Sequence, residues 1–262
     1  MQQPMSAPAA LFEWRSPAPS DGAPALSIIA PMHNEEKGAA ALVREIAAAV
    51  AGLDAEIIIV DDGSTDGTRS ALVEEKKSIA RLRVLAHEIR AGQSRAIRTG
   101  VLAARAPVAA TLDGDGQNDP ADIPALYRQL IREDAPKELA MVAGERRSRR
   151  DPPSRRLGSR VANAVRAQLL EDGAIDAGCG IKAFYREAFL RLPAFDHMHR
   201  YLPALMRREG FLVEFAAVAG RPRTHGRSKY TNLGRLFVAF RDVLGVMWLK
   251  DRARTPREIS EL

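Results

Sequence analysis

The sequence is poor in cysteine and in aromatic side chains, and each shortage excludes classes of protein. Its one cysteine, Cys179, rules out an intramolecular disulfide and most cysteine-ligated metal sites, so we expect a reducing compartment and a small buried thiol. Only 5% of the residues are aromatic, and no basic run alternates with aromatic side chains as in proteins that bind single-stranded nucleic acid. We therefore expect no nucleic-acid partner.

Long apolar runs are also missing. No stretch approaches the roughly 20 apolar residues that span a bilayer. Residues 1–25 are rich in proline and alanine and lack both the basic start and the continuous apolar run of a signal peptide. They are predicted to be a disordered leader.

The chain is long enough, at 262 residues, to bury a large core, and its 46% hydrophobic content is ordinary for a globular protein. The net charge of +6 comes mostly from arginine. This excess favours anionic partners such as phosphorylated ligands or acidic lipid headgroups.

Apolar, strand-like runs alternate with helix-like segments in the first half, which predicts an α/β fold with a largely parallel sheet. The expected strands are 26–30, 56–60, 82–86, 108–112 and 139–143, and the expected helices are 38–51, 93–105 and 123–132. The second half is less regular. It is expected to hold helices at 157–170, 186–191 and 201–208, a strand at 212–216 and a last helix at 233–250.

Three polar loops, 31–36, 61–66 and 113–117, directly follow expected strands. In open α/β sheets, ligands bind at the carboxyl ends of the strands, where loop amides and helix N-termini converge. The three loops are therefore predicted to line one crevice.

The third loop has the composition of a divalent-metal site. Residues i and i+2 of an extended chain project to the same side, so Asp113 and Asp115 face one point, and Gln117 adds a neutral oxygen nearby. Mg²⁺ prefers such oxygen ligands and usually holds substrate phosphates as well. The alternative is a plain acidic turn that ends a strand.

Two later segments are strongly basic. Residues 144–160 contain seven arginines in 17 positions, and residues 221–230 are also basic. Most of these side chains are expected to be solvated, but one or two phosphate contacts are predicted. The last helix is amphipathic and carries Trp248 with several basic residues, so it either packs on the core or lies at a lipid interface.

The order of four motifs resembles the GT-A glycosyltransferases of family two. They are Pro31-x-x-Asn-Glu35, Val60-Asp-Asp-Gly-Ser-Thr-Asp-Gly67, Asp113-x-Asp-x-Gln117-x-x-Pro120 and Arg223-x-x-Gly-x-Ser-Lys229. The last motif is similar to that of the dolichyl- and polyprenyl-phosphate sugar synthases. The resemblance extends over about residues 26–250, and all four motifs stand in the family's order.

The resemblance implies a GT-A fold: a mixed, mostly parallel sheet flanked by helices, here with an added C-terminal amphipathic helix. It implies a nucleotide pocket made by Pro31, Met32, Asn34, Glu35, Asp61, Asp62, Gly92, Ser94 and Asp113. The implied ligands of a Mg²⁺ or Mn²⁺ ion are Asp113, Asp115 and Gln117. The implied phosphate-binding residues are Arg146, Arg160, Arg223, Ser228 and Lys229, and the implied catalytic residues are Asp115, Arg223 and Lys229.

The resemblance also implies an activity, the inverting transfer of a sugar from a UDP- or GDP-sugar to a polyprenyl or dolichyl phosphate. Such an enzyme is expected to work in the cytoplasm, peripherally on the cytosolic face of a membrane, through its own amphipathic surface or a separate membrane protein. The corresponding domain boundaries are a leader at 1–25, a catalytic domain at 26–230 and an interfacial helix and tail at 231–262.

The chemistry of the acceptor leaves two other readings open. A lipid phosphate is ionised at pH 7 and needs no base, whereas a hydroxyl on a glycan or glycolipid needs a carboxylate such as Asp172 or Asp176. A non-catalytic nucleotide-binding or membrane scaffold is the remaining alternative. The intact acidic set argues against that last reading.

Overall fold

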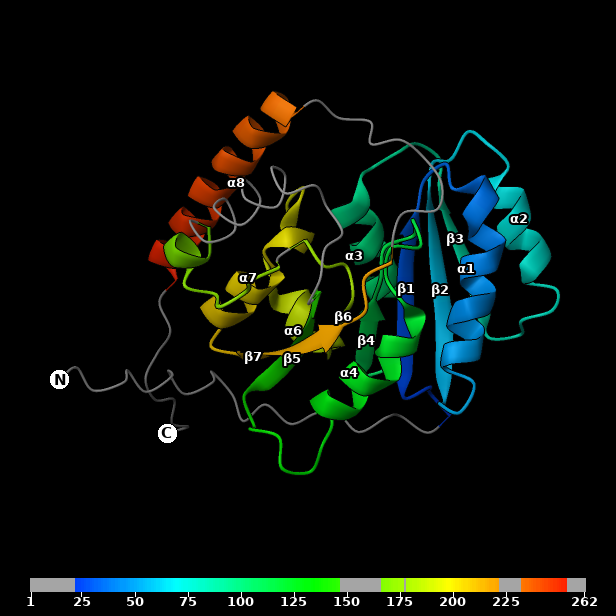
Figure 1. Cartoon of the computed structure of the whole chain (residues 1–262), viewed down its shortest axis with the longest axis horizontal. Coiled ribbons are helices and arrows are strands. Elements are labelled where there is room, and N and C mark those ends of the chain that lie inside the picture. The colour runs from blue at the N-terminus through cyan, green and yellow to red at the C-terminus, as the bar shows by residue number, and fades with distance from the viewer. Residues whose placement is uncertain (1–21, 147–165, 177, 222–231, 254–262) are drawn as a thin grey trace, which may run out of the picture.

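The computed structural model of the chain describes residues 22–146, 166–176, 178–221 and 232–253, and within the last range it leaves out the side chains of 232–237 and 239. Most of the predicted leader therefore lies outside the described residues. Seven strands form one sheet in the order β3-β2-β1-β4-β6-β5-β7. Helices cover the sheet, as Figure 1 shows.

The strands are β1 (Leu26–Met32), β2 (Ala55–Asp62), β3 (Leu82–His87), β4 (Val108–Thr111), β5 (Leu139–Arg146), β6 (Lys182–Tyr185) and β7 (Leu212–Val218). The helices are α1 (Glu36–Ala49), α2 (Thr68–Glu75), α3 (Gln93–Ala103), α4 (Ile123–Leu130), α6 (Arg186–Arg191), α7 (Leu202–Arg208) and α8 (Asn232–Arg252). Two short 3-10 helices are η1 (Pro120–Asp122) and η2 (Met198–Arg200).

The predicted mixed, mostly parallel sheet is confirmed. β1 pairs in parallel with β2 and β4, β2 with β3, and β5 with β7, whereas β6 runs antiparallel to both β4 and β5. β6 was not predicted from the sequence, and its four residues follow a turn rich in glycine and aspartate. Because β6 runs backwards, its first residue, Lys182, lies at the edge where the parallel strands end.

The central strands form because both of their faces are covered. Every residue of β1 and β2 is buried, as expected for parallel strands between two layers of helices. α3 lies close against this sheet: a Cβ added to Gly100 would stand 2.5 Å from the Ile29 side chain. The glycine therefore permits a tight contact between α3 and β1.

The amino edge of the sheet is held by one buried acid. Glu56 is 2% exposed and accepts hydrogen bonds from Ser27 Oγ at 2.7 Å and Arg83 Nη1 at 2.6 Å. The backbone N–H of Arg105 adds a third at 2.7 Å. Burial opposes ionisation of Glu56, but these donors outweigh it and lower the pKa of the carboxyl. This cluster ties β1, β2, β3 and the end of α3 together, away from the polar loops.

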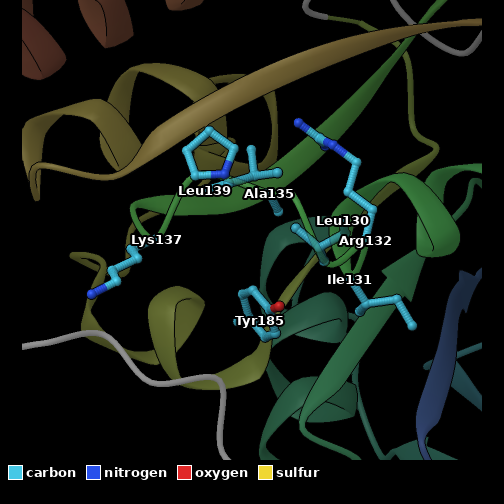
Figure 2. Close-up of a pocket in the computed structure, with 8 residues that line it drawn as sticks. Leu130, Ile131, Arg132, Ala135, Lys137, Leu139 and Tyr185 are labelled. Carbon is cyan, nitrogen blue, oxygen red and sulfur yellow. The ribbon is translucent and has the colours of Figure 1, made fainter.

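A cavity of about 270 Å³ also lies at this amino edge. Figure 2 shows Ile131, Arg132, Lys137 and Tyr185 around it. Arg132 is already paired with Glu214, at 2.7 Å. The cavity is thus separate from the edge where the polar loops converge.

α8 packs on the rest of the molecule through one side. Val246 is fully buried, Arg208 Nε donates to the carbonyl of Leu249 at 2.9 Å, and Lys250 Nζ donates to the carbonyl of Leu170 at 2.5 Å. No helix within the described residues is long and apolar enough to cross a membrane.

Candidate functional site

The loops after β1 and β2 are joined by hydrogen bonds between backbone and side chains. The N–H of Asn34 donates to Ser64 Oγ at 3.0 Å, and Asn34 Oδ1 accepts from the N–H of Thr65 at 2.8 Å. The N–H of Glu35 donates to Thr68 Oγ1 at 2.8 Å. Asn34 adopts a left-handed backbone (φ 56°), which asparagine tolerates better than most residues. The predicted nucleotide-pocket residues of β1 therefore stand beside those of β2.

Asp61 is a fully buried acid at the end of β2. Its carboxylate accepts from the N–H of Ser64 at 3.0 Å and from Arg69 Nε at 2.7 Å. Burial alone raises the pKa of Asp61, but these donors outweigh it, and the pKa is lowered overall. Asp61 is thus a buried carboxylate that accepts hydrogen bonds from its own loop and from α2.

Asp62 is occupied in holding the loop before α3. Its two oxygens accept from the N–H groups of Ala91 and Gly92, each at 2.8 Å, and His87 Nδ1 lies 2.7 Å from Oδ1. Burial opposes its ionisation, but these bonds prevail and lower its pKa. Asp62 therefore fixes the backbone at Gly92, whose φ of 93° favours glycine. The predicted nucleotide contacts of both residues remain predictions.

The acidic loop after β4 lies directly against the end of β1. A Cβ on Gly114 would stand 2.3 Å from the carbonyl oxygen of Pro31 and 2.8 Å from Met32 Cγ. Only glycine permits this approach, which brings the predicted metal loop beside the predicted nucleotide loop. The loop after β1 therefore lies beside both of the other loops with which it was expected to share a crevice, while the crevice itself remains a prediction.

Asp113 is held between three elements. Its Oδ1 accepts from Gln93 Nε2 at 2.7 Å, and its N–H donates to Asn118 Oδ1 at 3.0 Å. A Cβ on Gly180 would stand 2.3 Å from the Asp113 carboxyl carbon, so that position has no room for a side chain. Asp115 Oδ1 accepts from the N–H of Gln117 at 3.1 Å.

The electrostatics of this pair suit a divalent ion. Burial raises the pKa of Asp113, and the nearby Asp115 carboxylate raises it further. A bound cation would relieve that repulsion. Among the described residues no three His, Cys, Asp or Glu side chains gather to hold a metal. Two carboxylates with an amide and substrate phosphates are nevertheless a usual Mg²⁺ ligand set.

A lysine that the sequence analysis missed lies beside the acids. Lys182, at the start of β6, is 4% exposed and donates to the carbonyl of Cys179. Burial lowers its pKa, while Asp113 and Asp176 act in the opposite direction. A small cleft there is lined by Gln93, Asp113, Gly180, Lys182 and His199 among others. The signal in the sequence was a lysine directly after the Gly-Ile that follows a tight turn.

Arg146 and Asp176 form an ion pair that is largely buried. Arg146 Nε and a terminal nitrogen donate to the two oxygens of Asp176 at 2.6 and 3.1 Å. Burial lowers the pKa of Arg146, but the Asp176 carboxylate outweighs this and raises it. Asp172 is fully buried and pairs with Arg166, at 2.5 Å. Both acids considered as bases are thus bound to arginines.

Ser94, one of the predicted nucleotide-pocket residues, is buried against His199. Its Oγ lies 2.7 Å from His199 Nδ1 and accepts from the backbone N–H of His199 at 3.3 Å. Burial lowers the pKa of His199 well below its usual range, and the charges of Arg200 and Lys182 add to this. Ser94 Oγ and His199 Nδ1 therefore share one buried hydrogen bond.

Arg160, Arg223, Ser228 and Lys229, the remaining predicted phosphate-binding residues, lie outside the described residues. Their assignment remains a prediction. Next to them in the chain, Arg221 pairs with Asp119 at 2.7 Å, close to the acidic loop.

A protein-family match and two curated relatives agree with one another. Residues 27–192 match the family described as glycosyl transferase family 2. The chain is 34% identical over 232 residues to dodecaprenyl-phosphate galacturonate synthase of Rhizobium johnstonii, covering 85% of this chain and 66% of that protein. It is 31% identical over 219 residues to undecaprenyl-phosphate 4-deoxy-4-formamido-L-arabinose transferase of Pseudomonas fluorescens, covering 82% and 63%. The chain thus spans slightly less than two thirds of these curated relatives.

Solved structures share the fold. Glucosyl-3-phosphoglycerate synthase of Mycobacterium tuberculosis, in complex with Mn²⁺, UDP and glucosyl-3-phosphoglycerate, matches with a TM-score of 0.65 at 20% identity, over 87% of this chain and 80% of that one. A complex of the same protein with Mg²⁺ and UDP matches with a TM-score of 0.66. The predicted GT-A fold is confirmed.

Proposed function

Because this chain belongs to glycosyl transferase family 2, we propose that it moves a sugar from a UDP- or GDP-sugar to a polyprenyl phosphate, with a divalent metal and with inversion. The observation that carries the proposal is the composition of the carboxyl edge. There Asp61 is a buried acid with a lowered pKa, and Asp113, beside Asp115, lies near the cations Arg146 of β5 and Lys182 of β6.

The donor half of the site fits a nucleoside diphosphate. Asp61 offers an acceptor to the base, and the loop fixed by Asp62 places Gly92 and Ser94 nearby. Mg²⁺ or Mn²⁺ held by Asp113, Asp115 and Gln117 would stabilise the charge that develops on the leaving diphosphate. The described side chains that assist this charge balance are Lys182 and Arg146.

The acceptor half fits a group that brings its own negative charge. A phosphate is largely dianionic at pH 7, so one of its oxygens can attack the sugar C1 as the C1–O bond to the diphosphate breaks. A hydroxyl would need a carboxylate base. Within the described residues, both candidates for that role are engaged by arginine: Asp176 by Arg146 and Asp172 by Arg166. A carboxylate held in this way is a weak base.

The relatives strengthen the choice of acceptor. Two of them are named for dodecaprenyl phosphate and undecaprenyl phosphate as acceptors. A polyprenyl phosphate resides in a bilayer, and nucleotide sugars are cytosolic metabolites, so we place the reaction peripherally on the cytosolic face. Arg160, Arg223, Ser228 and Lys229 are proposed to hold the phosphates from the segments outside the described residues.

The test is a transfer assay with paired acceptors. Purified full-length protein with Mg²⁺ or Mn²⁺ is given radiolabelled UDP- and GDP-sugars, including uronates, and either undecaprenyl phosphate or a mixture of oligosaccharides. We expect label in the lipid phosphate only, lost on adding EDTA. Label in the oligosaccharides alone would replace this proposal with hydroxyl transfer. Tight nucleotide binding without turnover on any acceptor would replace it with a scaffold role.

A further inference from the structure

The outward side of α8 carries an exposed apolar stripe. Phe240, Leu244 and Trp248 are spaced four residues apart, so they lie on one side of the helix. Their exposed fractions are 60%, 49% and 59%. Among the side chains that the structure describes, the two exposed aromatic ones, Phe240 and Trp248, both belong to this stripe. Figure 1 shows α8 on the outside of the molecule, on the side away from α1 and α2.

The stripe is not the side through which α8 packs on the protein, because the opposite side of the helix makes those contacts. Val246 is fully buried, and Asp242 Oδ2 lies 3.1 Å from His197 Nδ1. Near the end of the helix, Arg208 and Lys250 make the bonds to backbone carbonyls described above. The fold therefore holds the stripe in a fixed orientation toward the outside.

Two exposed arginines border the stripe. At 100° per residue, Arg241 and Arg252 both project on the Trp248 side of the stripe, Arg241 beside Phe240 along the axis and Arg252 one turn after Trp248. The exposed Asp251 projects within the stripe at its carboxyl end, so the two arginines outnumber the one acid there. Aromatic and leucine side chains beside arginine are typical of helices that lie in the interface of a bilayer, with the apolar face among the acyl chains and the cations at the phosphates. A net charge of +6 favours the same surface.

We propose that this surface, formed by Phe240, Leu244 and Trp248 with Arg241 and Arg252, docks the protein on a bilayer that contains anionic lipids. We call it the α8 outer face. The proposal deepens the proposed function, because a polyprenyl-phosphate acceptor would lie in that bilayer. Asp242 also ties α8 to His197, whose ring lies 6.5 Å from that of His199, a residue that lines the cleft with Asp113 and Lys182. Docking through the α8 outer face would therefore fix the orientation of this cleft relative to the lipid.

The direct test uses the fluorescence of Trp248. The chain has two tryptophans, so Trp14→Phe leaves Trp248 as the sole reporter. The full-length variant is mixed with vesicles of phosphatidylcholine, alone or with phosphatidylglycerol, without donor or acceptor. We expect a blue shift and quenching by brominated lipid on the mixed vesicles, reduced by salt. Unchanged emission on both vesicle types would overturn the proposal.

Substitutions then identify the surface. Phe240→Ser with Leu244→Ser should weaken vesicle binding in sedimentation at least about tenfold. Arg241→Gln with Arg252→Gln should weaken the preference for anionic vesicles roughly 25-fold, about fivefold for each charge. The matched control is Val73→Ser with Leu102→Ser, which removes two side chains that are 51% and 54% exposed on α2 and α3. The control should bind vesicles like the parent protein.

Two further results would contradict docking through the α8 outer face. Vesicle binding equal in all variants would place docking elsewhere. Self-association in analytical ultracentrifugation that Phe240→Ser with Leu244→Ser abolishes, without any change in vesicle binding, would make the face a protein interface. Transfer to a short-chain, detergent-dispersed polyprenyl phosphate separates the two proposals. This transfer should persist in the α8 variants, because a dispersed acceptor needs no docking on a bilayer. If the parent protein binds vesicles but neither it nor any variant transfers sugar, the proposed function fails and the docking proposal stands.

Discussion

At the scale of single residues, Asp115 is the side chain on which the metal proposal can be tested most directly. It has Asp113 as a close neighbour, and the two carboxylates repel each other. Asp115→Asn removes one charge from the proposed metal ligands while keeping the size of the side chain. We expect turnover to fall by about 10²–10³-fold, with a weaker dependence on Mn²⁺ concentration.

The control for this change is Asp134→Asn. That acid is 86% exposed, and its partner Arg132 lies at the far cavity. The activity of Asp134→Asn should match that of the parent protein. Steady-state assays over a Mn²⁺ titration make the comparison, and near-parental turnover by Asp115→Asn would contradict the assignment of Asp115 as a ligand.

The buried His199 should make the free energy of unfolding depend on pH. Burial gives it a lower pKa in the folded chain than the value of 6.5 in the unfolded chain, so the unfolded chain binds the proton more tightly. The contribution of His199 to the free energy of unfolding is therefore fully present above pH 6.5 and is lost as the pH falls below that value. The slope reaches at most about 1.4 kcal/mol per pH unit.

Urea unfolding between pH 5 and 8 measures this effect. His199→Gln should lower the free energy of unfolding at neutral pH, because a buried bond to Ser94 is disturbed, and should flatten the slope below the unfolded pKa of histidine. His197→Gln, at a ring that is 32% exposed, is the comparison. An unchanged slope in His199→Gln would assign the pH dependence to another group.

At the scale of elements, two glycines in helices predict opposite effects of the same substitution. Gly100 of α3 has no room for a methyl group, because the added carbon would stand 2.5 Å from the Ile29 side chain. Gly38 of α1 has nothing within 4 Å of that position. Gly100→Ala should lower the free energy of unfolding by about 1–3 kcal/mol, and Gly38→Ala should raise it by about 0.5–1 kcal/mol. Chemical denaturation of the two variants tests the packing of α3 on β1.

The same scale explains what the sequence could and could not predict. The parallel strands and their helices follow from local apolar patterns, and the meeting of the polar segments at the ends of β1, β2 and β4 was predicted because the carboxyl ends of parallel strands converge. β6 was missed because its four residues become a strand only through pairing with β4 and β5. Lys182 reaches the site for the same reason. The contact of His199 with Ser94 spans 105 residues and leaves no local pattern.

At the scale of the whole molecule, the proposal predicts coupled binding of nucleotide and metal. A ligand that binds the folded chain alone at a hundred times its Kd adds about 2.7 kcal/mol of stability. UDP or GDP with Mn²⁺ should therefore raise Tm by roughly 5 to 10 °C, and either component alone should raise it much less. Thermal shift with both nucleotides identifies the base. Equal shifts with and without metal would contradict a metal that bridges protein and diphosphate.

The bonds between the first two loops have a consequence for the thermodynamics of donor binding. Asn34, Glu35 and Thr65 are fixed by their own hydrogen bonds before any ligand arrives, so the chain has already lost that freedom in folding. The nucleoside should therefore bind to a preorganised surface formed by these two loops, with little entropic penalty. Thr65→Gly makes the loop after β2 more flexible and changes no acidic residue. It should leave the enthalpy of UDP or GDP binding nearly unchanged and make the entropy of binding less favourable.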